Sequence, residues 1–203
     1  MLKKKKKQLG FTLIELLVVI AIIGILASVV LVNLSGAREK AKVAISGKQQ
    51  RRMTIAVELY YDDMGFYPPD VNRGWDPGLV KPLPWSPDEG TTDPPSGTYS
   101  DPGTDCSHCP SNWQTSVQNN WSGPYLQRWP RYTPWKGKYD YNYWTTETNR
   151  DGCILQPGIY IGVEGDYQDD HTIPEDSEEM MINKGFDEEA CLNNESQMLL
   201  WPL

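Results

Sequence analysis

The sequence has few of the residues on which enzyme active sites depend. Only two histidines occur in 203 residues, His108 and His171, and neither lies in a recognisable catalytic pattern. Glycine-rich loops of the kind that hold phosphates are absent, and no candidate nucleophile has a convincing general base. The sequence therefore predicts a protein that is not an enzyme and that requires no cofactor.

Basic residues are scarce once the N-terminus is set aside. Of 19 lysines and arginines, five are the consecutive Lys3 to Lys7, which leaves 14 against 27 acidic residues and a net charge of −13. A body this acidic repels nucleic acid and anionic lipid headgroups, and it attracts divalent cations. Nucleic acid is therefore not an expected partner.

Charge is also lacking from Phe11 to Val32, where Glu15 is the single exception. A helix of this length spans roughly 33 Å, about the thickness of the hydrocarbon core of a membrane. The lysines before it fit the positive-inside rule, which places the body outside the cytoplasm. The pattern predicts a leader over residues 1–10 and a transmembrane half-helix over residues 11–34.

Residues 35–64 contain no proline and are rich in helix-forming residues. Four apolar residues recur there at helical spacing: Met53, Val57, Tyr60 and Met64. Gly65 then provides a stop signal. We predict one nearly continuous helix from about Phe11 to Met64, whose amphipathic half, 35–64, packs its apolar stripe on the body.

The body, residues 65–203, combines loops with strands. Residues 65–135 hold 13 of the 16 prolines, yet also six of the eight tryptophans, which argues against simple disorder. Residues 139–145 and 158–163 read as strands, and a last strand is expected near 198–201. The sequence thus predicts an α+β fold: a long N-terminal helix packed on a small antiparallel sheet, with a loop-rich insertion.

The run from Gly10 to Glu15, Gly-Phe-Thr-Leu-Ile-Glu, places a carboxylate near the start of the apolar segment. Burying such a group in lipid costs about 2.5–3.5 kcal/mol, or somewhat less near the edge, so it needs a partner. No basic residue follows until Arg38. Cleavage after Gly10 would give Phe11 a new α-amino group, with which Glu15 of a neighbouring copy could pair during lateral assembly.

This pattern resembles the class III leader of type IV pilins and of the pseudopilins of type II secretion. The resemblance implies cleavage by prepilin peptidase after Gly10, methylation of Phe11 and assembly through Glu15. Other interpretations of the segment are an uncleaved signal anchor and a secretory signal cut near Ala27-Ser28.

The implied function is that of a structural subunit of a type II secretion pseudopilus or type IV pilus-like filament, polymerised through its N-terminal helix. The implied partners are other copies of the chain, prepilin peptidase, an inner-membrane assembly platform and minor pilins. The chain would cross the inner membrane once and then join a periplasmic or cell-surface filament. The alternative is a minor or tip pilin that binds DNA or a surface ligand through the 70–135 insertion.

A second resemblance lies in the body. Residues 56–69, Ala-Val-Glu-Leu-Tyr-Tyr-Asp-Asp-Met-Gly-Phe-Tyr-Pro-Pro, resemble the helix exit of major pseudopilins. Residues 123–130 and 134–141 resemble the elements that enter the small antiparallel sheet of that group. The resemblance therefore implies a pilin-like fold.

Four cysteines lie in the body: Cys106, Cys109, Cys153 and Cys191. An even number outside the cytoplasm favours disulfides, but Cys106-Ser107-His108-Cys109 could also be half of a metal site or a redox motif. Free thiols are the third interpretation. Four cysteines allow three pairings, of which Cys106–Cys109 with Cys153–Cys191 is the most economical in sequence.

The C-terminal part contains an acidic run with four candidate calcium ligands: Glu164, Asp166, Asp169 and Asp170. Oxygen ligands around a glycine suit a hard cation such as Ca²⁺, and major pseudopilins, which the chain resembles, often bind calcium near the C-terminus. The competing interpretation is a solvated acidic loop, because the run does not reproduce the family's calcium loop residue by residue.

Basic and aromatic residues alternate between positions 128 and 139. The basic set is Arg128, Arg131, Lys136 and Lys138, and the aromatic set is Trp129, Tyr132, Trp135 and Tyr139. Such interleaving could stack on single-stranded nucleic acid. Because the same residues fall on the sheet-entry pattern and the rest of the body is acidic, we favour core packing with basic edges.

Overall fold

A computed structural model describes residues 11–71, 73–83, 106–130, 132–150, 152–165, 172–188 and 191–203, without the side chains of residues 29–33. The chain divides into two compact units, Met1–Glu39 and Lys40–Leu203. Helix α1, Leu13–Met64, begins in the first unit and ends in the second. The predicted long helix is thus confirmed to within two residues at its start.

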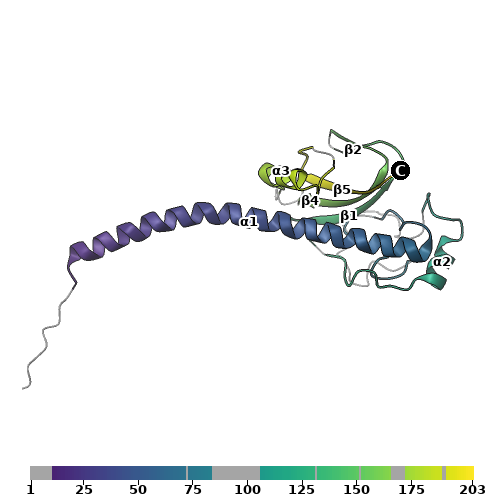
Figure 1. The fold of residues 1–203 in the computed structure, drawn as a ribbon, viewed down its shortest axis with the longest axis horizontal. Helices are drawn as coiled ribbons and strands as arrows, with labels where there is room; N and C mark the ends of the chain where they lie inside the picture. Colours follow the sequence, from purple (N-terminus) through teal and green to yellow (C-terminus); the bar gives the residue numbers. More distant parts are fainter. Residues whose placement is uncertain are drawn as a thin grey trace, which may run out of the picture. The chain divides into compact units, whose positions relative to one another are not determined.

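The second unit holds a small antiparallel sheet. Its elements in chain order are α2 (Trp113–Asn120), β1 (Lys136–Trp144), β2 (Thr148–Arg150), β3 (Cys153–Leu155), β4 (Gly158–Gly165), α3 (Glu175–Asn183) and β5 (Glu195–Pro202). The sheet has the strand order β1-β4-β5, and β2 and β3 form a separate two-stranded sheet (Figure 1). The α+β fold with a long N-terminal helix and a small antiparallel sheet is therefore confirmed.

The C-terminal half of α1 supplies one side of the core. All four residues of the predicted stripe are buried, with exposed fractions of 0% for Met53, Val57 and Tyr60 and 8% for Met64. Gln50, also buried, donates Nε2 hydrogen bonds to the backbone oxygens of Ile161 and Phe186, both at 3.1 Å. The helix is thus fixed to the central strand by apolar packing and by a polar contact.

A glycine permits the close approach of α1 to the segment after α3. A Cβ atom at Gly47 would lie 2.2–2.5 Å from three carbon atoms of the Phe186 ring. Real Cβ contacts are not this short, so any larger residue at this position would force the ring or the helix to move.

The two faces of the β1-β4-β5 sheet differ in chemistry, because neighbouring residues of a strand point to opposite sides. One face is apolar and belongs to the same core as the α1 stripe: Tyr139, Tyr141, Ile161, Val163 and Met198. The other face is polar and is buried as well: Asp140, Asn142, Glu164, Glu195 and Gln197. The sheet therefore has two interior faces.

The segment after α1 is ordered by a buried carboxylate. Asp76 accepts hydrogen bonds from the backbone amides of Leu79 at 2.8 Å, Val80 at 3.0 and 3.1 Å, and Lys81 at 3.0 Å. Burial raises the pKa of Asp76 to about 6, although the amides that bond to it act in the opposite direction. This contact orders residues 76–81 of the proline-rich connector.

All three main strands were predicted, although each begins earlier or ends later than expected. The predicted strands 139–145, 158–163 and 198–201 correspond to β1, β4 and β5. Helices α2 and α3 and the β2–β3 hairpin were missed. Both helices lack a side-chain cap at the N-terminus, and β2 and β3 have three residues each, so their local signals are weak.

Within the part of the chain that the structure describes, no helix is both long enough and apolar enough to cross a membrane. The predicted membrane half, 11–34, includes residues 29–33, whose side chains lie outside the described ones. That assignment therefore stays a prediction.

Replacing a residue of the buried stripe should destabilise the body. Met53→Ala removes a fully buried side chain and should lower the free energy of unfolding by about 2–5 kcal/mol. Ile55→Ala is the matched control, because Ile55 lies on the same helix and is 57% exposed, and should change it by less than about 0.5 kcal/mol. Denaturant titration of the detergent-solubilised full chain measures both. Equal effects would contradict the packing of α1 described here.

Candidate functional site

The start of α1 is closed by a reciprocal pair of hydrogen bonds. The backbone amide of Thr12 donates to Oε2 of Glu15 at 2.8 Å, and the Thr12 hydroxyl donates to the same oxygen at 2.7 Å. In return, the Glu15 amide donates to Oγ1 of Thr12 at 3.3 Å. Because α1 begins at Leu13, Thr12 is the N-cap residue and Glu15 the third helical residue, which is the arrangement of a capping box.

The capping box gives the Glu15 carboxylate a role within its own chain. Both bonds from Thr12 go to Oε2, and a carboxylate can accept further bonds at its second oxygen. Phe11 precedes the cap and is 93% exposed, whereas Gly10 lies outside the described residues. Sequence reasoning identified Glu15 but missed its bonds with Thr12, although the Thr-x-x-Glu spacing is itself a capping signal.

A cluster of buried charges lies on the polar face of the sheet. Each strand contributes one carboxylate: Asp140 from β1, Glu164 from β4 and Glu195 from β5. Nη2 of Arg150 lies 2.7 Å from Oε1 of Glu195 and 3.2 Å from Oε1 of Glu164. Nε of Arg73 lies 3.0 Å from that same Glu164 oxygen and 4.0 Å from Oδ2 of Asp140. Three carboxylates thus share two guanidinium groups.

Burial and the excess of negative charge in the cluster raise the pKa values of two of its carboxylates. Burial raises the pKa of Glu164 to about 7; the Arg73 and Arg150 cations oppose this rise, and the Glu195 carboxylate adds to it. Burial, followed by the Glu164 carboxylate, also raises the pKa of Asp140 well above its usual range. Oδ1 of Asp140 has no hydrogen-bond partner among the described residues. Burial and the mutual repulsion of these acids therefore allow the cluster to hold a proton near neutral pH.

The charge cluster bears on the predicted calcium site. Glu164 is buried and already forms ion pairs with two arginines. Its carboxylate therefore takes part in the packing of the body. The other three candidate ligands, Asp166, Asp169 and Asp170, lie outside the described residues. Calcium binding by this run remains a prediction. Sequence reasoning missed the arginines, because Arg73 comes from the connector and Arg150 from β2.

The cysteines form the two disulfides that are closest in sequence. Cys106 bonds to Cys109 and Cys153 bonds to Cys191. The second bridge joins β3 to the segment before β5, so the C-terminal strand is tied covalently to the β2–β3 hairpin. The disulfide interpretation and its pairing are confirmed.

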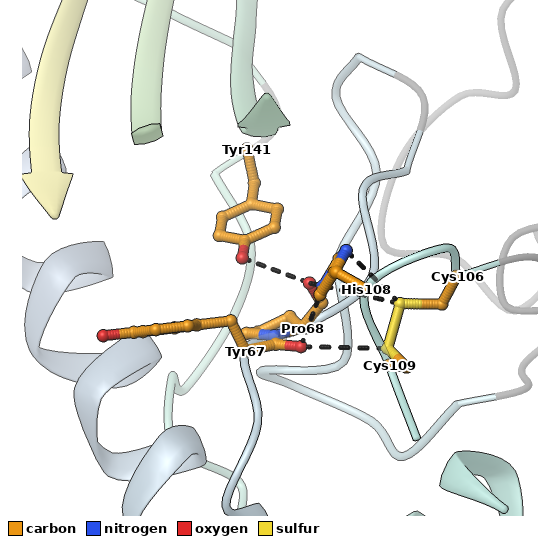
Figure 2. The surroundings of a disulfide bond; sticks show 6 residues. All are labelled: Tyr67, Pro68, Cys106, His108, Cys109 and Tyr141. Carbon is orange, nitrogen blue, oxygen red and sulfur yellow. Dashed lines mark hydrogen bonds between the residues drawn. A yellow bond between two sulfur atoms is a disulfide. The ribbon is translucent and has the colours of Figure 1, made fainter. Parts of the chain in front are cut away.

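The first disulfide lies beside a well-packed histidine (Figure 2). Nε2 of His108 lies 3.0 Å from the backbone oxygen of Pro68 and 3.3 Å from that of Tyr67. The ring stacks on Tyr143, with centroids 3.5 Å apart and an angle of 5° between the planes. Burial lowers the pKa of His108, although its bonds to the two carbonyls act in the other direction. The loop is thereby attached to the exit of α1.

The aromatic residues between 128 and 139 form core, as we favoured. Trp129, Trp135 and Tyr139 are buried in the main apolar cluster. Tyr132 is exposed and lies under Lys138, whose Nζ is 4.3 Å from the ring centroid. These three buried rings therefore cannot stack on a nucleic acid, which supports the interpretation of the pattern as core packing with basic edges.

A shallow basic groove of about 310 Å³ lies along the body part of α1. Four cations line it: Lys48, Arg51, Arg52 and Lys184. The guanidinium of Arg51 lies 5.1 Å from the centroid of the Phe186 ring, which with Ile55 provides an apolar floor. On a body of net negative charge, this groove is a place that attracts anionic groups.

Comparisons with known proteins agree with the N-terminal pattern. Residues 5–31 match the family model described as the prokaryotic N-terminal methylation motif. The type II secretion system core protein G of Vibrio cholerae serotype O1 is 40% identical over 81 residues, which cover 40% of this chain and 55% of that protein. The protein of the same name from Escherichia coli K12 is 44% identical over 68 residues, 34% of this chain and 46% of that protein.

These matches cover part of each protein. The core protein G of Aeromonas hydrophila is 40% identical over 79 residues, 39% of this chain and 54% of that protein. The chain thus spans about half the length of the curated relatives it matches. No solved structure matches the chain. Of these matches, the family model is the one that is placed at the N-terminus, over residues 5–31.

Removing the Glu164 carboxyl should change how stability depends on pH. The pKa of Glu164 is about 7 in the folded state against an ordinary value of 4.5, so between these values the folded state binds more protons than the unfolded state. The free energy of unfolding therefore falls as pH rises from about 4.5 to about 7. Glu164→Gln should make this fall smaller, as measured by denaturant titration at several pH values.

Glu147→Gln is the control for this experiment, because Glu147 is an exposed carboxylate between β1 and β2. It should leave the pH profile of the wild type unchanged. A Glu164→Gln profile parallel to that of the wild type would contradict the titration behaviour of the cluster.

Proposed function

We propose that this chain, a type IV pilin-like protein similar to the major pseudopilins, is a structural subunit of a type II secretion pseudopilus or a related filament. The observation that carries the proposal is the start of α1. There the methylation motif of residues 5–31 coincides with an apolar helix and a single carboxylate, Glu15. The matched relatives are named core proteins of type II secretion. The role is structural rather than catalytic.

Processing prepares the chain for assembly. Prepilin peptidase cuts after Gly10, and Phe11 becomes the methylated N-terminal residue. Before assembly the apolar segment anchors the chain in the inner membrane, with the acidic body outside the cytoplasm. The subunits then leave the membrane and join a periplasmic filament, helped by an assembly platform and minor pilins.

Glu15 directs how neighbouring copies associate. Its Oε2 accepts both bonds from Thr12, which fixes the carboxylate at the start of the helix. The other oxygen is then the one that receives the α-amino group of Phe11 from an adjacent copy. In a bundle of apolar helices, where little else distinguishes one axial position from another, this charge pair sets the stagger between subunits.

The alternative role, a minor or tip pilin that binds DNA or a surface ligand through residues 70–135, is not favoured. The relatives carry the name core protein G, and Trp129 and Trp135 of the insertion are buried in the core. The candidate contact Arg131 lies outside the described residues. Calcium binding near Glu164 is a separate proposal, which calorimetric titration of the chain with Ca²⁺ would test.

Two substitutions at the helix start separate charge pairing from helix capping. Glutamine is also accepted at the third position of a capping box, so Glu15→Gln keeps the cap and removes the charge. It should reduce filament yield by about tenfold or more, since each tenfold change reflects only about 1.4 kcal/mol. Thr12→Ala keeps the charge, costs about 1 kcal/mol of helix stability and should allow filaments to form. Electron microscopy of filaments released from the lysed cell envelope measures the yield.

Glu58→Gln is the matched control, because Glu58 is an exposed carboxylate on the body part of α1. It should assemble as the wild type does. Normal filament yield from Glu15→Gln would overturn the proposed role of the charge, and loss of filaments only in Thr12→Ala would show that capping alone matters.

A further inference from the structure

The basic groove along α1 holds positive charge with which no described carboxylate pairs. Four cations line the groove: Lys48, Arg51, Arg52 and Lys184. Within the described part of the chain, none of them forms an ion pair. Nη1 of Arg52 donates to the neutral amide oxygen of Gln49 at 3.4 Å, and Arg51 lies over the Phe186 ring. The groove therefore has positive charge to offer to a carboxylate of another molecule.

The floor of the groove is formed before any partner binds. The backbone oxygen of Phe186 accepts hydrogen bonds from Nε2 of Gln50 at 3.1 Å and from Oγ of Ser196 at 2.8 Å. The Phe186 ring fits against Gly47. Beside it, Ile55 is 57% exposed. A partner in the groove would thus cover apolar surface as well as meet the cations, and it would bind a site that needs little ordering.

The same body presents a complementary surface at the acidic start of α3, which consists of exposed carboxylates: Glu175, Asp176 and Glu179. Glu175 and Glu179 are four residues apart, so they lie on one side of the helix, about 6 Å from each other along its axis. Lys48 and Arg52 have the same separation on α1. Two carboxylates of one copy therefore match two cations of another in spacing as well as in sign.

The overall charge of the body makes such a match important. With 14 basic and 27 acidic residues after the leader, the body carries a net charge of −13, so neighbouring copies repel each other at close range. At physiological ionic strength this repulsion acts over roughly 8 Å, which is the range of charges that meet in an interface. A contact that brings the basic groove against an acidic surface is therefore favoured over one that brings two acidic surfaces together.

We propose that the basic groove of one copy binds the acidic start of α3 of a second copy, with Lys48 and Arg52 facing Glu175 and Glu179. This inference rests on the proposed function, because it places the contact in the filament. The two surfaces are different parts of one chain, so the contact is head-to-tail and repeats from copy to copy. Exposed ion pairs contribute little to stability, and the contact therefore acts mainly by selecting how neighbouring bodies are oriented.

Charge reversal tests the contact. Lys48→Glu with Arg52→Glu should reduce the yield of filaments from the lysed cell envelope by about tenfold or more, because like charges then meet at every contact along the filament. Glu175→Lys with Glu179→Lys should do the same. A chain with all four substitutions should recover at least about a third of the wild-type yield, because its charges are complementary again.

Two reversals elsewhere on the body are the matched controls. Arg128→Glu and Glu147→Lys change exposed residues that do not line the groove or lie in α3, and both should leave the yield at the wild-type level. No recovery in the chain with four substitutions, while Glu15→Gln still reduces the yield, would overturn this contact and leave the proposed function standing. A loss caused by the groove reversal alone would assign the groove to another anionic partner. A wild type without filaments would instead refute the proposed function.

Cysteine cross-linking measures the same contact without reversing charges, and it decides the matter if a reversed variant does not fold. Arg52→Cys and Glu179→Cys are placed in separate chains that are expressed together. Mild oxidation of the filaments should join one chain of each kind into a covalent dimer, and filaments of either variant alone should give none. Absence of the mixed dimer from filaments that contain both chains would refute the contact.

Discussion

The carboxylate of Glu15 imposes the constraint on which the functional account depends. It lies at the third position of α1, where Thr12 binds one of its oxygens through both the backbone amide and the hydroxyl. A charge in an apolar segment needs partners, and this cap supplies the first of them within the chain. The remaining capacity of the group is available to a neighbouring copy, so under the proposed function the same residue closes a helix and provides a contact for polymerisation.

In the body, both faces of the three-stranded sheet are buried. One face packs on the α1 stripe around Met53 and Tyr60. The other carries three carboxylates, and Arg73 and Arg150 approach them from outside the sheet. Breaking such a buried pair is costly because a charge is left without compensation. The arginines therefore hold the connector and the β2–β3 hairpin against the sheet.

Residues with strong local signals could be predicted from the sequence. The spacing of Met53 and Tyr60 identified the buried side of α1, and the economical cysteine pairing proved correct. The Arg73–Arg150 cluster could not be predicted, because its members are brought together only by tertiary packing of the connector, the hairpin and the sheet. Helix α3 was missed for a related reason: its acidic sequence suggests a solvated tail, and it lacks a side-chain cap.

Under the proposed function, the chain that assembles is the processed one, with its amine at the position that Glu15 of a neighbour can reach. The most direct measurement is the intact mass and N-terminal sequence of the protein isolated from its native filament. We predict a chain that begins at Phe11 and carries a methyl group on its α-nitrogen. A filament subunit that begins at Met1, or one cut near Ser28, would contradict the account.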